Sequence, residues 1–455
     1  MIEQTGDIWF SQWLVIEGKG LRNIVNMALA AIAHQEEYGE QRIRKRREVD
    51  QRNLEAMVEV VIANLARAAL LNPEAPMVAV SLTKSKPLTR FDRHIFRQLR
   101  DVLTKLQNEA FLTLLVPAGR GWSSTMQPSQ WFLSKLREHR VTIADIAQHP
   151  HEETIWLAKN EWSFGEQSGI FAKRRKIIDY KRDTTDSVKF REEMFAINRY
   201  LANANIGLAP SFNGAMPDLS KRQLRRSFSL PDGASAQQPK FTLGGRLFGG
   251  WWLNMPRADR KHILIDGEPL IELDFASMFP RLACAAVGLK LPLGDIYDIP
   301  ELQNHRAAVK SVVSTLLFAK GERHRLPSEI KQQLPEGMTI ADIRKIIIRH
   351  HPFMDAILEK GLGLSLMFTE SQIMVATLLD LNRQGVTALG IHDSLITART
   401  KVLQAKEAMQ RAAKAITGYV LPVEIKEGLE AVEEEETYQI NQTSNVIPSG
   451  QHLWV

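Results

Sequence analysis

The sequence predicts an α+β protein, and three patterns support this class. Apolar residues recur at helical spacing from Leu21 to Leu29, and a second periodic stretch runs from Leu54 to Leu71. Residues 270–275 form a short apolar strand pattern that carries Asp274 near its end, and helical spacing follows from Met278. Residues 387–398 have the pattern of two strands that are joined by a polar turn.

The composition is that of an ordinary soluble globular protein. The chain has 455 residues, of which 44% are apolar and 24% charged, and this length accommodates about two to four domains. Cys284 is the only cysteine, which excludes disulfides, argues against a Cys-based zinc site and suggests a cytoplasmic location. We expect no signal peptide and no membrane span, because the most apolar long stretch, residues 57–71, contains three polar or charged residues.

Charge is distributed unevenly along the chain. Residues 51–250 hold 29 Lys and Arg against 19 Asp and Glu, whereas residues 424–436 hold seven Glu and one Lys. A basic middle suggests a polyanionic partner. Solvated helix faces are the alternative explanation for a single basic run such as residues 42–47.

Residues 1–76 are predicted to be a helical N-terminal region without chemistry of its own. From Met77 the pattern changes to a strand, a helix over residues 93–108, a strand over 110–116, a Gly-rich turn and a helix over 128–139. This order is compatible with a winged-helix-like module in residues 77–172. A small structural domain without a nucleic-acid role fits the same pattern.

Residues 173–240 are predicted to form a basic helical region and a linker. A helical stretch over residues 187–203 is flanked by basic clusters, which suit contacts to a phosphate backbone. The candidate nucleic-acid contacts in these clusters are Lys173, Arg174, Arg175, Arg225 and Arg226. Residues 229–240 have the Gly, Pro, Ser and Gln content of an exposed linker, so we expect the main domain boundary there and a C-terminal domain over residues 241–455.

The C-terminal domain begins with a Gly-rich stretch, residues 243–257, that contains Arg246, Trp251 and Trp252. Paired glycines permit close approach of the backbone, so Arg246 between them is a candidate contact to phosphate or sugar. The two tryptophans are expected to lie in the core.

Residues 305–319 are predicted to form a helix with a functional face. Arg306, Lys310, Ser314 and Phe318 are spaced by four and therefore share one side. Two cations and an aromatic ring in a row could bind a triphosphate and stack a base. An ordinary amphipathic helix would have the same spacing.

Asp274 and Asp393 are the candidate metal ligands. Each lies at the end of a predicted strand or in the turn after one, where a carboxylate is held firmly. Two carboxylates on adjacent strands can bind two Mg²⁺ ions, which stabilise the attacking and leaving oxygens of an in-line phosphoryl displacement.

Together these motifs resemble those of the family A DNA polymerases and the single-subunit phage-type RNA polymerases. Asp274 matches the metal-binding Asp of motif A, and Arg306 with Lys310 and Phe318 resembles motif B. His392-Asp393-Ser394 resembles motif C, with Ser as in the RNA enzymes. The resemblance covers residues 243–400. The overall pattern is similar to that of the divergent family A-like polymerases carried by plasmids, prophages and genomic islands.

Two upstream elements extend the resemblance, and others depart from it. Gly245-Arg246 is similar to an element that contacts template or hybrid, and Asn254-Met-Pro resembles the Asn-Ile-Pro that precedes motif A in the DNA enzymes. The Asp-Phe-x-Ser-x-Phe-Pro text of residues 274–280 is closer to family B, and the distance from Asp295 to Arg306 is short for family A. No exonuclease acid cluster is present, so proofreading is not implied.

The resemblance implies a right-hand polymerase. The palm would carry Asp274 and Asp393, the fingers would carry the helix of residues 305–319, and the N-terminal half would act as thumb and clamp. It also implies two Mg²⁺ ions, the main-chain carbonyl of Phe275 as a further ligand, and contacts of Asn254 and His392 to nucleic acid. The expected partners are a DNA primer-template, dNTPs and replication proteins of a mobile element, with no membrane.

The nature of the product depends on few residues. Phe279, five residues after Asp274, is bulky where the resembling RNA enzymes have a small residue, and this favours dNTPs. Ser394 and the Gly-Arg element favour the alternative of an RNA polymerase or primase. A non-catalytic DNA-binding replication or regulatory protein is the rival from another class, but a protein that only binds DNA has no need of Asp274, Lys310 and Asp393 together.

Overall fold

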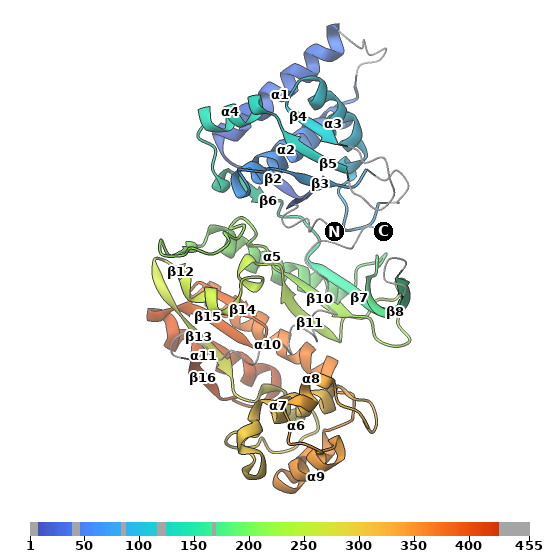
Figure 1. The fold of residues 1–455 in the computed structure, drawn as a ribbon, viewed down its shortest axis with the longest axis vertical. Coiled ribbons are helices and arrows are strands. Elements are labelled where there is room, and N and C mark those ends of the chain that lie inside the picture. The colour runs from blue at the N-terminus through green and yellow to red at the C-terminus, as the bar shows by residue number, and fades with distance from the viewer. Residues whose placement is uncertain (1–7, 39–45, 83–87, 116–123, 166–169, 427–455) are drawn as a thin grey trace. The chain divides into compact units, whose positions relative to one another are not determined.

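The computed structural model describes residues 8–38, 46–82, 88–115, 124–165 and 170–426, without the side chains of His94, Phe96 and residues 161–174 (Figure 1). These residues form a mixed α and β structure of two compact units. Of the described residues, unit 1 comprises 8–153 and 215–222, and unit 2 comprises 154–214 and 223–426.

Unit 1 contains a four-stranded sheet of order β1-β3-β5-β4, a two-stranded sheet of β2 and β6, and four α-helices. Its elements are β1 (Ile8–Trp9), β2 (Leu14–Ile16), α1 (Lys19–Tyr38), α2 (Glu48–Leu71), β3 (Val78–Val80), α3 (Leu99–Asn108), β4 (Leu112–Leu115), β5 (Ser124–Pro128), α4 (Gln130–Glu138) and β6 (Ile146–Gln148). The strand β1 pairs in parallel with β3, and the other pairs are antiparallel.

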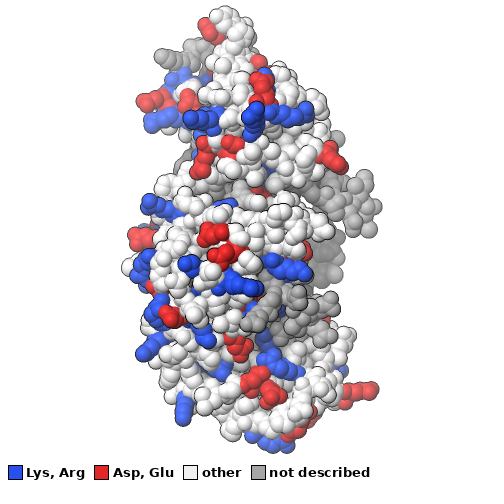
Figure 2. Space-filling view, turned by 90° about the vertical axis from the view of Figure 1, so that its left-hand side faces the viewer, with Lys and Arg blue, Asp and Glu red and all other residues white. Residues whose placement is uncertain are grey.

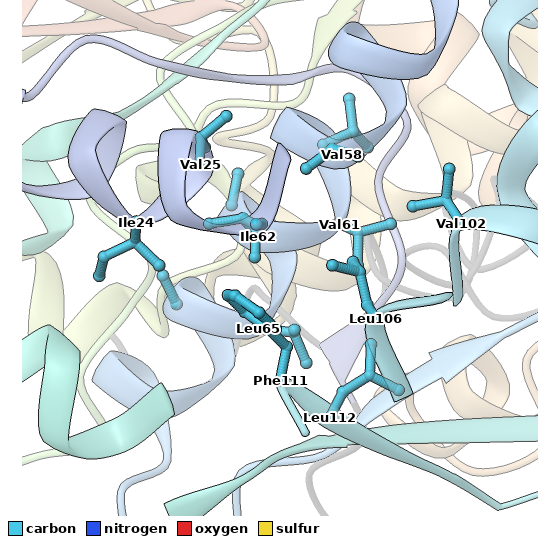
Figure 3. Packing of buried hydrophobic residues seen from close by; sticks show 14 of the residues in the cluster. Ile24, Val25, Val58, Val61, Ile62, Leu65, Val102, Leu106, Phe111 and Leu112 are labelled. Atoms are coloured by element: carbon cyan, nitrogen blue, oxygen red, sulfur yellow. The ribbon is translucent and has the colours of Figure 1, made fainter. Parts of the chain in front are cut away.

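Helix α2 is the centre of the unit 1 core. Figure 3 shows Val58, Val61, Ile62 and Leu65 of this helix among apolar side chains of α1, α3 and the start of β4. A helix that is apolar on nearly all sides must be buried, and this explains the uninterrupted burial from Val60 to Ala69. The polar exceptions are satisfied: the Asn64 side chain, for example, hydrogen-bonds the main chain of Ser11 in both directions.

This core changes the predicted domain boundaries. The described parts of residues 1–76 and 77–153 pack into one unit, because α1 and α2 bury the sheet that contains β3, β4 and β5. The helices and strands predicted over residues 77–139 are present, but their four-stranded sheet and shared core differ from the predicted winged-helix-like module. The Gly-rich turn of residues 118–122 lies outside the described residues.

A short segment from the middle of the chain also belongs to unit 1. Residues 215–222 contribute Asp218, whose carboxylate accepts a hydrogen bond of 2.6 Å from Nε of Arg67 in α2. Both side chains are buried, with 5% and 8% of their surface exposed. Unit 1 is therefore completed by residues that follow the first part of unit 2 in the sequence.

Unit 2 contains two sheets. The first has the order β11-β10-β7-β8, and the second has the order β14-β15-β13-β12-β9, with β16 also paired to β13. Their strands are β7 (Ile155–Gly165), β8 (Ile170–Ile177), β9 (Ile206–Leu208), β10 (Arg225–Ser229), β11 (Gly244–Phe248), β12 (Ile263–Ile265), β13 (Glu268–Phe275), β14 (Ala388–Ile391), β15 (Ser394–Ala398) and β16 (Val423–Lys426).

The predicted linker is a loop within unit 2. Strands β10 and β11, which flank residues 230–243, pair with each other in antiparallel fashion. Their ladder keeps the two ends of the loop together, so a domain boundary at residue 240 is wrong. The composition of residues 229–240 correctly indicated a turn, but composition alone cannot distinguish a loop between paired strands from a link between domains.

The α-helices of unit 2 are α5 (Thr185–Asn203), α6 (Met278–Ala286), α7 (Arg306–Phe318), α8 (Ser328–Gln332), α9 (Ile340–His350), α10 (Gly363–Arg383) and α11 (Val402–Thr417). Helices α6 to α9 gather at one end of the unit, at the bottom of Figure 1. In the described part of the chain, α10 alone is long and apolar enough to cross a membrane. Here it is a core helix, which packs against α11, β11 and α5.

Candidate active site

Two acidic residues meet at one end of the larger sheet of unit 2. Strand β13 pairs with β15 so that Asp274 lies opposite Ser394. Strands β14 and β15 form a hairpin with Ile391 opposite Ser394, and the two-residue turn between them contains His392 and Asp393. The left-handed backbone of His392, with φ of 53°, closes this tight turn. The register and this turn therefore place Asp393 near Asp274, at the same end of the sheet.

The environment of Asp274 favours a neutral carboxyl when no cation is bound. Burial raises its pKa to about 7, with a further contribution from the negative charge of Asp393, and the positive charges of Lys426 and Lys310 oppose this shift. Lys426 in β16 donates a hydrogen bond of 2.7 Å to Oδ2 of Asp274. The other oxygen, Oδ1, is buried and has no hydrogen-bond partner among the described residues.

These features fit a divalent cation such as Mg²⁺. Two close carboxylates, one with an unpaired buried oxygen, form the kind of hard-oxygen site that attracts this ion. Within the described residues no group of three or more His, Cys, Asp or Glu side chains is arranged around a metal position. Mg²⁺ commonly needs only one or two protein carboxylates, because water and substrate phosphates complete its shell.

Helix α7 presents the face that the sequence predicted. Its other side buries Ala308, Val309, Val312, Val313, Leu316 and Leu317 in the core. Arg306, Lys310, Ser314 and Phe318 lie on the less buried side. Arg306 donates a hydrogen bond of 2.6 Å to Asp295, and Lys310 is close enough to Asp274 to affect its pKa.

The ring of Phe318 connects α7 to the helix after Asp274. It lies 6.1 Å, centroid to centroid, from the ring of Phe279 in α6. It also lies against Gly363 at the start of α10, where a Cβ atom would come within 2.3 Å of the ring. Phe279 is only half-buried, so it is not one of the core residues of α6.

Arg246 lies in β11 and points to the same group of residues. Its Nε donates a hydrogen bond of 3.0 Å to Oε2 of Glu370 in α10, and Nη2 lies 2.9 Å from the same oxygen in an ion pair. The guanidinium carbon lies 5.5 Å from the centre of the Phe279 ring. The preceding Gly245 permits this approach of β11 to α10, because its φ is 89° and a Cβ atom would lie 2.8 Å from both Phe228 and Ser371.

His392 is a neutral residue in this structure. Burial, and after it the positive charge of Arg246, lower its pKa to about 4, although Asp393 opposes the shift. Its ring makes an edge contact with Phe248, with 6.3 Å between the centroids. At neutral pH it therefore offers a hydrogen-bonding ring rather than a cation to a ligand.

The Gly-rich stretch of residues 243–257 has its two tryptophans in the core, as predicted. Trp251 and Trp252 are buried, and Nε1 of Trp252 donates to the main-chain oxygen of Gly390 at 3.3 Å. Asn254 is exposed directly after the short helical turn Trp251–Leu253. Its predicted contact to nucleic acid stays a prediction.

Arg226 has a different role from the predicted one. Arg226 is 0% exposed and its guanidinium bonds to the main-chain oxygen of Gly245, Ser371, Gln372 and Glu193. A side chain enclosed in this way cannot contact nucleic acid, so that prediction is wrong. Arg226 instead joins β10 to α10.

Arg225 and Arg175 are more accessible than Arg226. Arg225 lies over the Trp156 ring at 4.2 Å. Arg175 is half-buried and donates to Ser227 and to the main-chain oxygen of Phe228. The side chains of Lys173 and Arg174 lie outside the described ones. On the face drawn in Figure 2, basic and acidic side chains are interspersed and do not gather in one patch.

Two residues of the site were missed from the sequence. Glu370 is the only charged residue between Gly363 and Leu379, and a lone acid in an apolar helix is a usable signal for a functional or paired group. Lys426 gave no signal, since its contact with Asp274 spans 152 residues.

No protein-family model matches the chain, and no curated protein matches it. A matching solved structure is the POL domain of Pol1 from M. smegmatis in complex with DNA primer-template and dNTP. That match covers 92% of this chain and 67% of the other, with 10% sequence identity and a TM-score of 0.29.

Proposed function

We propose that this protein is a template-directed nucleotidyltransferase, a DNA polymerase that adds dNTPs to a primer 3′-hydroxyl. The observation that carries the proposal is the pairing of Asp274 with Ser394, which brings two carboxylates together at one end of a sheet. The motif spacing of residues 243–400 supports the same function, as does the side of α7 that carries Lys310.

The residues around this pair have distinct roles in the proposal. Asp274, Asp393 and the main-chain carbonyl of Phe275 would hold two Mg²⁺ ions. When bound, such ions lower the pKa of the primer hydroxyl and stabilise charge on the transferred phosphoryl group. Lys310 would neutralise charge on the pyrophosphate.

Three further residues would act on the substrate rather than on the metal. Arg306 would bind the triphosphate, and Ser314 and Phe318 would lie beside the incoming base. Their common side on α7 supports these roles.

Lys426 has a role of its own in this proposal. Its ammonium group stabilises the ionised form of Asp274 and so opposes the rise in pKa that burial causes. The same contact orients the carboxylate and leaves Oδ1 as the atom available to a ligand.

The choice between DNA and RNA product rests on few residues. The hydroxyl of Ser394 donates to the main-chain oxygen of Ile391 at 3.0 Å inside the hairpin. Ser394 therefore has a structural partner within the hairpin, while its place after Asp393 and the Gly-Arg element still support the alternative of an RNA polymerase or primase. The bulk of Phe279 supports dNTP use.

The test is a primer-extension assay with labelled dNTPs and NTPs, with and without primer. Asp274→Asn and Asp393→Asn are each expected to lower nucleotide addition by a factor on the order of 10³ or more, because the ions contribute several kcal/mol to the transition state. Binding of primer-template should change little, because phosphate contacts elsewhere supply the affinity.

The matched control is Asp232→Asn, which removes an exposed acid from the loop between β10 and β11. It should leave both activity and binding unchanged. Absence of nucleotide addition by the wild type, together with retained DNA binding, would instead support the non-catalytic alternative.

A further inference from the structure

Glu370 is the most unusual residue of unit 2 that the proposed mechanism does not use. Its side chain is 0% exposed in the middle of α10. Oε2 accepts a hydrogen bond from Nε of Arg246 and lies 2.9 Å from Nη2, and Oε1 is buried with no hydrogen-bond partner in the described part of the chain. A buried carboxylate in this setting depends on its single cation, since removal of one partner leaves an uncompensated charge.

The cation that Glu370 holds is part of the candidate site. The Arg246 side chain is 17% exposed. Its Nε–H group donates to Glu370, and the planar guanidinium lies over the Phe279 ring. Arg246 is therefore fixed along one edge by a carboxylate and across one face by an aromatic ring, and its remaining donors are available to a ligand.

Phe279 is in turn held from two sides. Arg246 covers its face, and the Phe318 ring packs against it in a tilted arrangement. Contacts thus run from Glu370 in α10, through Arg246 in β11, to Phe279 in α6 and Phe318 in α7. The four residues belong to four elements, and Glu370 is the buried end of the series.

We propose that Glu370 is a positioning residue for sugar selection, which fixes Arg246 over Phe279 and so holds that ring where an incoming 2′-hydroxyl would lie. This inference rests on the proposed function and adds a specificity-determining residue to it. Glu370 touches neither nucleotide nor metal. Its effect passes through Arg246, which distinguishes it from a residue that only stabilises the core.

The experiment measures kcat/KM for one dNTP and the matching NTP on one primed template. Glu370→Gln keeps the shape of the side chain and one acceptor but removes the charge. We expect the ratio of dNTP to NTP efficiency to fall by about three- to thirtyfold, the range that loss of a cation–π contact spans. Arg246→Lys should lower the ratio by a similar factor, because an ammonium group cannot bind Glu370 and cover Phe279 in the same planar way.

A double variant separates positioning from stability. If Glu370 acts through Arg246, adding Glu370→Gln to Arg246→Lys should lower the ratio no further. The control is Ser371→Ala, which removes the adjacent contact of α10 to Arg226 and leaves Glu370 intact. It should lower the urea midpoint of unfolding without changing the ratio.

Two outcomes would refute the inference alone. One is an equal loss of dNTP and NTP efficiency in Glu370→Gln, which leaves the ratio unchanged. The other is additive effects in the double variant. A wild-type protein that incorporates neither nucleotide would refute the proposed function, and the inference with it.

Discussion

Three ionisable side chains near the candidate site have pKa values far from their ordinary range, and burial is the first cause in each. The pKa values of Asp274 and Glu370 are raised to about 7, and the pKa of His392 is lowered to about 4. All three shifts favour the neutral form. With pKa values of about 7, Asp274 and Glu370 are each about half ionised at neutral pH, so a bound cation or a nearby charge can shift the protonation of either one.

Glu370 should make the protein less stable as the pH rises. Its pKa in the folded chain is about 7, against 4.5 ordinarily. Between these values the folded state binds a proton that the unfolded state does not, so the free energy of unfolding falls with increasing pH. Relative to Glu370→Gln, the wild type should lose on the order of 2 kcal/mol between pH 5 and pH 8.

Urea unfolding of both proteins at the two pH values checks this expectation. Groups that titrate in both proteins contribute equally to the two free energies of unfolding, so the difference between wild type and variant reports on Glu370. A difference that stays constant with pH would show that Glu370 ionises at its ordinary pKa.

Phe279 is expected to control which sugar the protein accepts. A 2′-hydroxyl beside this ring would lose its water without gaining a partner, at a cost of about 1 to 3 kcal/mol. The wild type should therefore prefer dNTPs by roughly ten- to a hundredfold, and Phe279→Ala should relax this preference.

Relative incorporation of dNTP and NTP on one primed template measures the effect. Phe195→Ala, which truncates an exposed ring of α5, is the control and should retain the preference. Equal use of both nucleotides by the wild type would favour an RNA polymerase or primase.

At the scale of elements, the site depends on how closely β11 approaches α10. Gly245 makes this approach possible, and the buried Arg226 and Glu370 bond across the contact from either side. The strand–turn–helix that carries Asp274 and the hairpin that carries Asp393 then join through the β13–β15 ladder. The position of Arg246 is thus determined by packing, whereas that of the two acids is determined by strand register.

Gly245→Ala tests this packing. The variant combines a left-handed backbone with a Cβ atom 2.8 Å from Phe228 and Ser371. We expect a loss of about 2 to 4 kcal/mol in the free energy of unfolding, because strain and overpacking add. Nucleotide addition should also fall, because Arg246 is the next residue in the chain and would be displaced.

Gly233→Ala is the matched control. Gly233 also has a positive φ, of 77°, but no atom lies within 4 Å of its added Cβ. The Gly233→Ala variant should lose only about 1 kcal/mol in the free energy of unfolding, which is the cost of the left-handed backbone. Similar urea midpoints for the two variants would show that the close approach of β11 to α10 is not under steric control.

At the scale of the whole molecule, the chain leaves unit 1, begins unit 2 and returns to unit 1 for residues 215–222. Asp218 secures the returning segment through its buried ion pair with Arg67. The stability of unit 1 thus depends on a residue that is distant in the sequence from its other elements.

Asp218→Asn should destabilise unit 1 by about 3 kcal/mol, because it leaves the Arg67 charge buried without its partner. Hydrogen exchange of the amides of α2 should become faster, while that of α10 in unit 2 stays unchanged. Glu48→Gln removes the exposed pair with Arg52 in the same unit and should cost about 0.5 kcal/mol or less. Equal acceleration in α2 and α10 would contradict the assignment of Asp218 to unit 1.

Sequence by itself determined most of the local structure and the identity of the two acids. Apolar periodicity located α1, α2, α5, α6 and α7, and the turn chemistry around Asp393 located the β14–β15 hairpin. These features depend on neighbours within a few residues, which is the range over which spacing and turn preferences act.

Only the tertiary structure decided which residues meet and which domains they form. The Arg246–Glu370 pair spans 124 residues and the Lys426–Asp274 pair spans 152, and no local pattern carries such information. Arg225 and Arg226 are adjacent arginines that the sequence alone cannot tell apart. Strand alternation places them on opposite faces of β10 and directs Arg226 into the core. Burial depends on what the rest of the chain packs against each face, and for that reason the role of Arg226, the loop at residues 229–240 and the division into units were beyond the sequence.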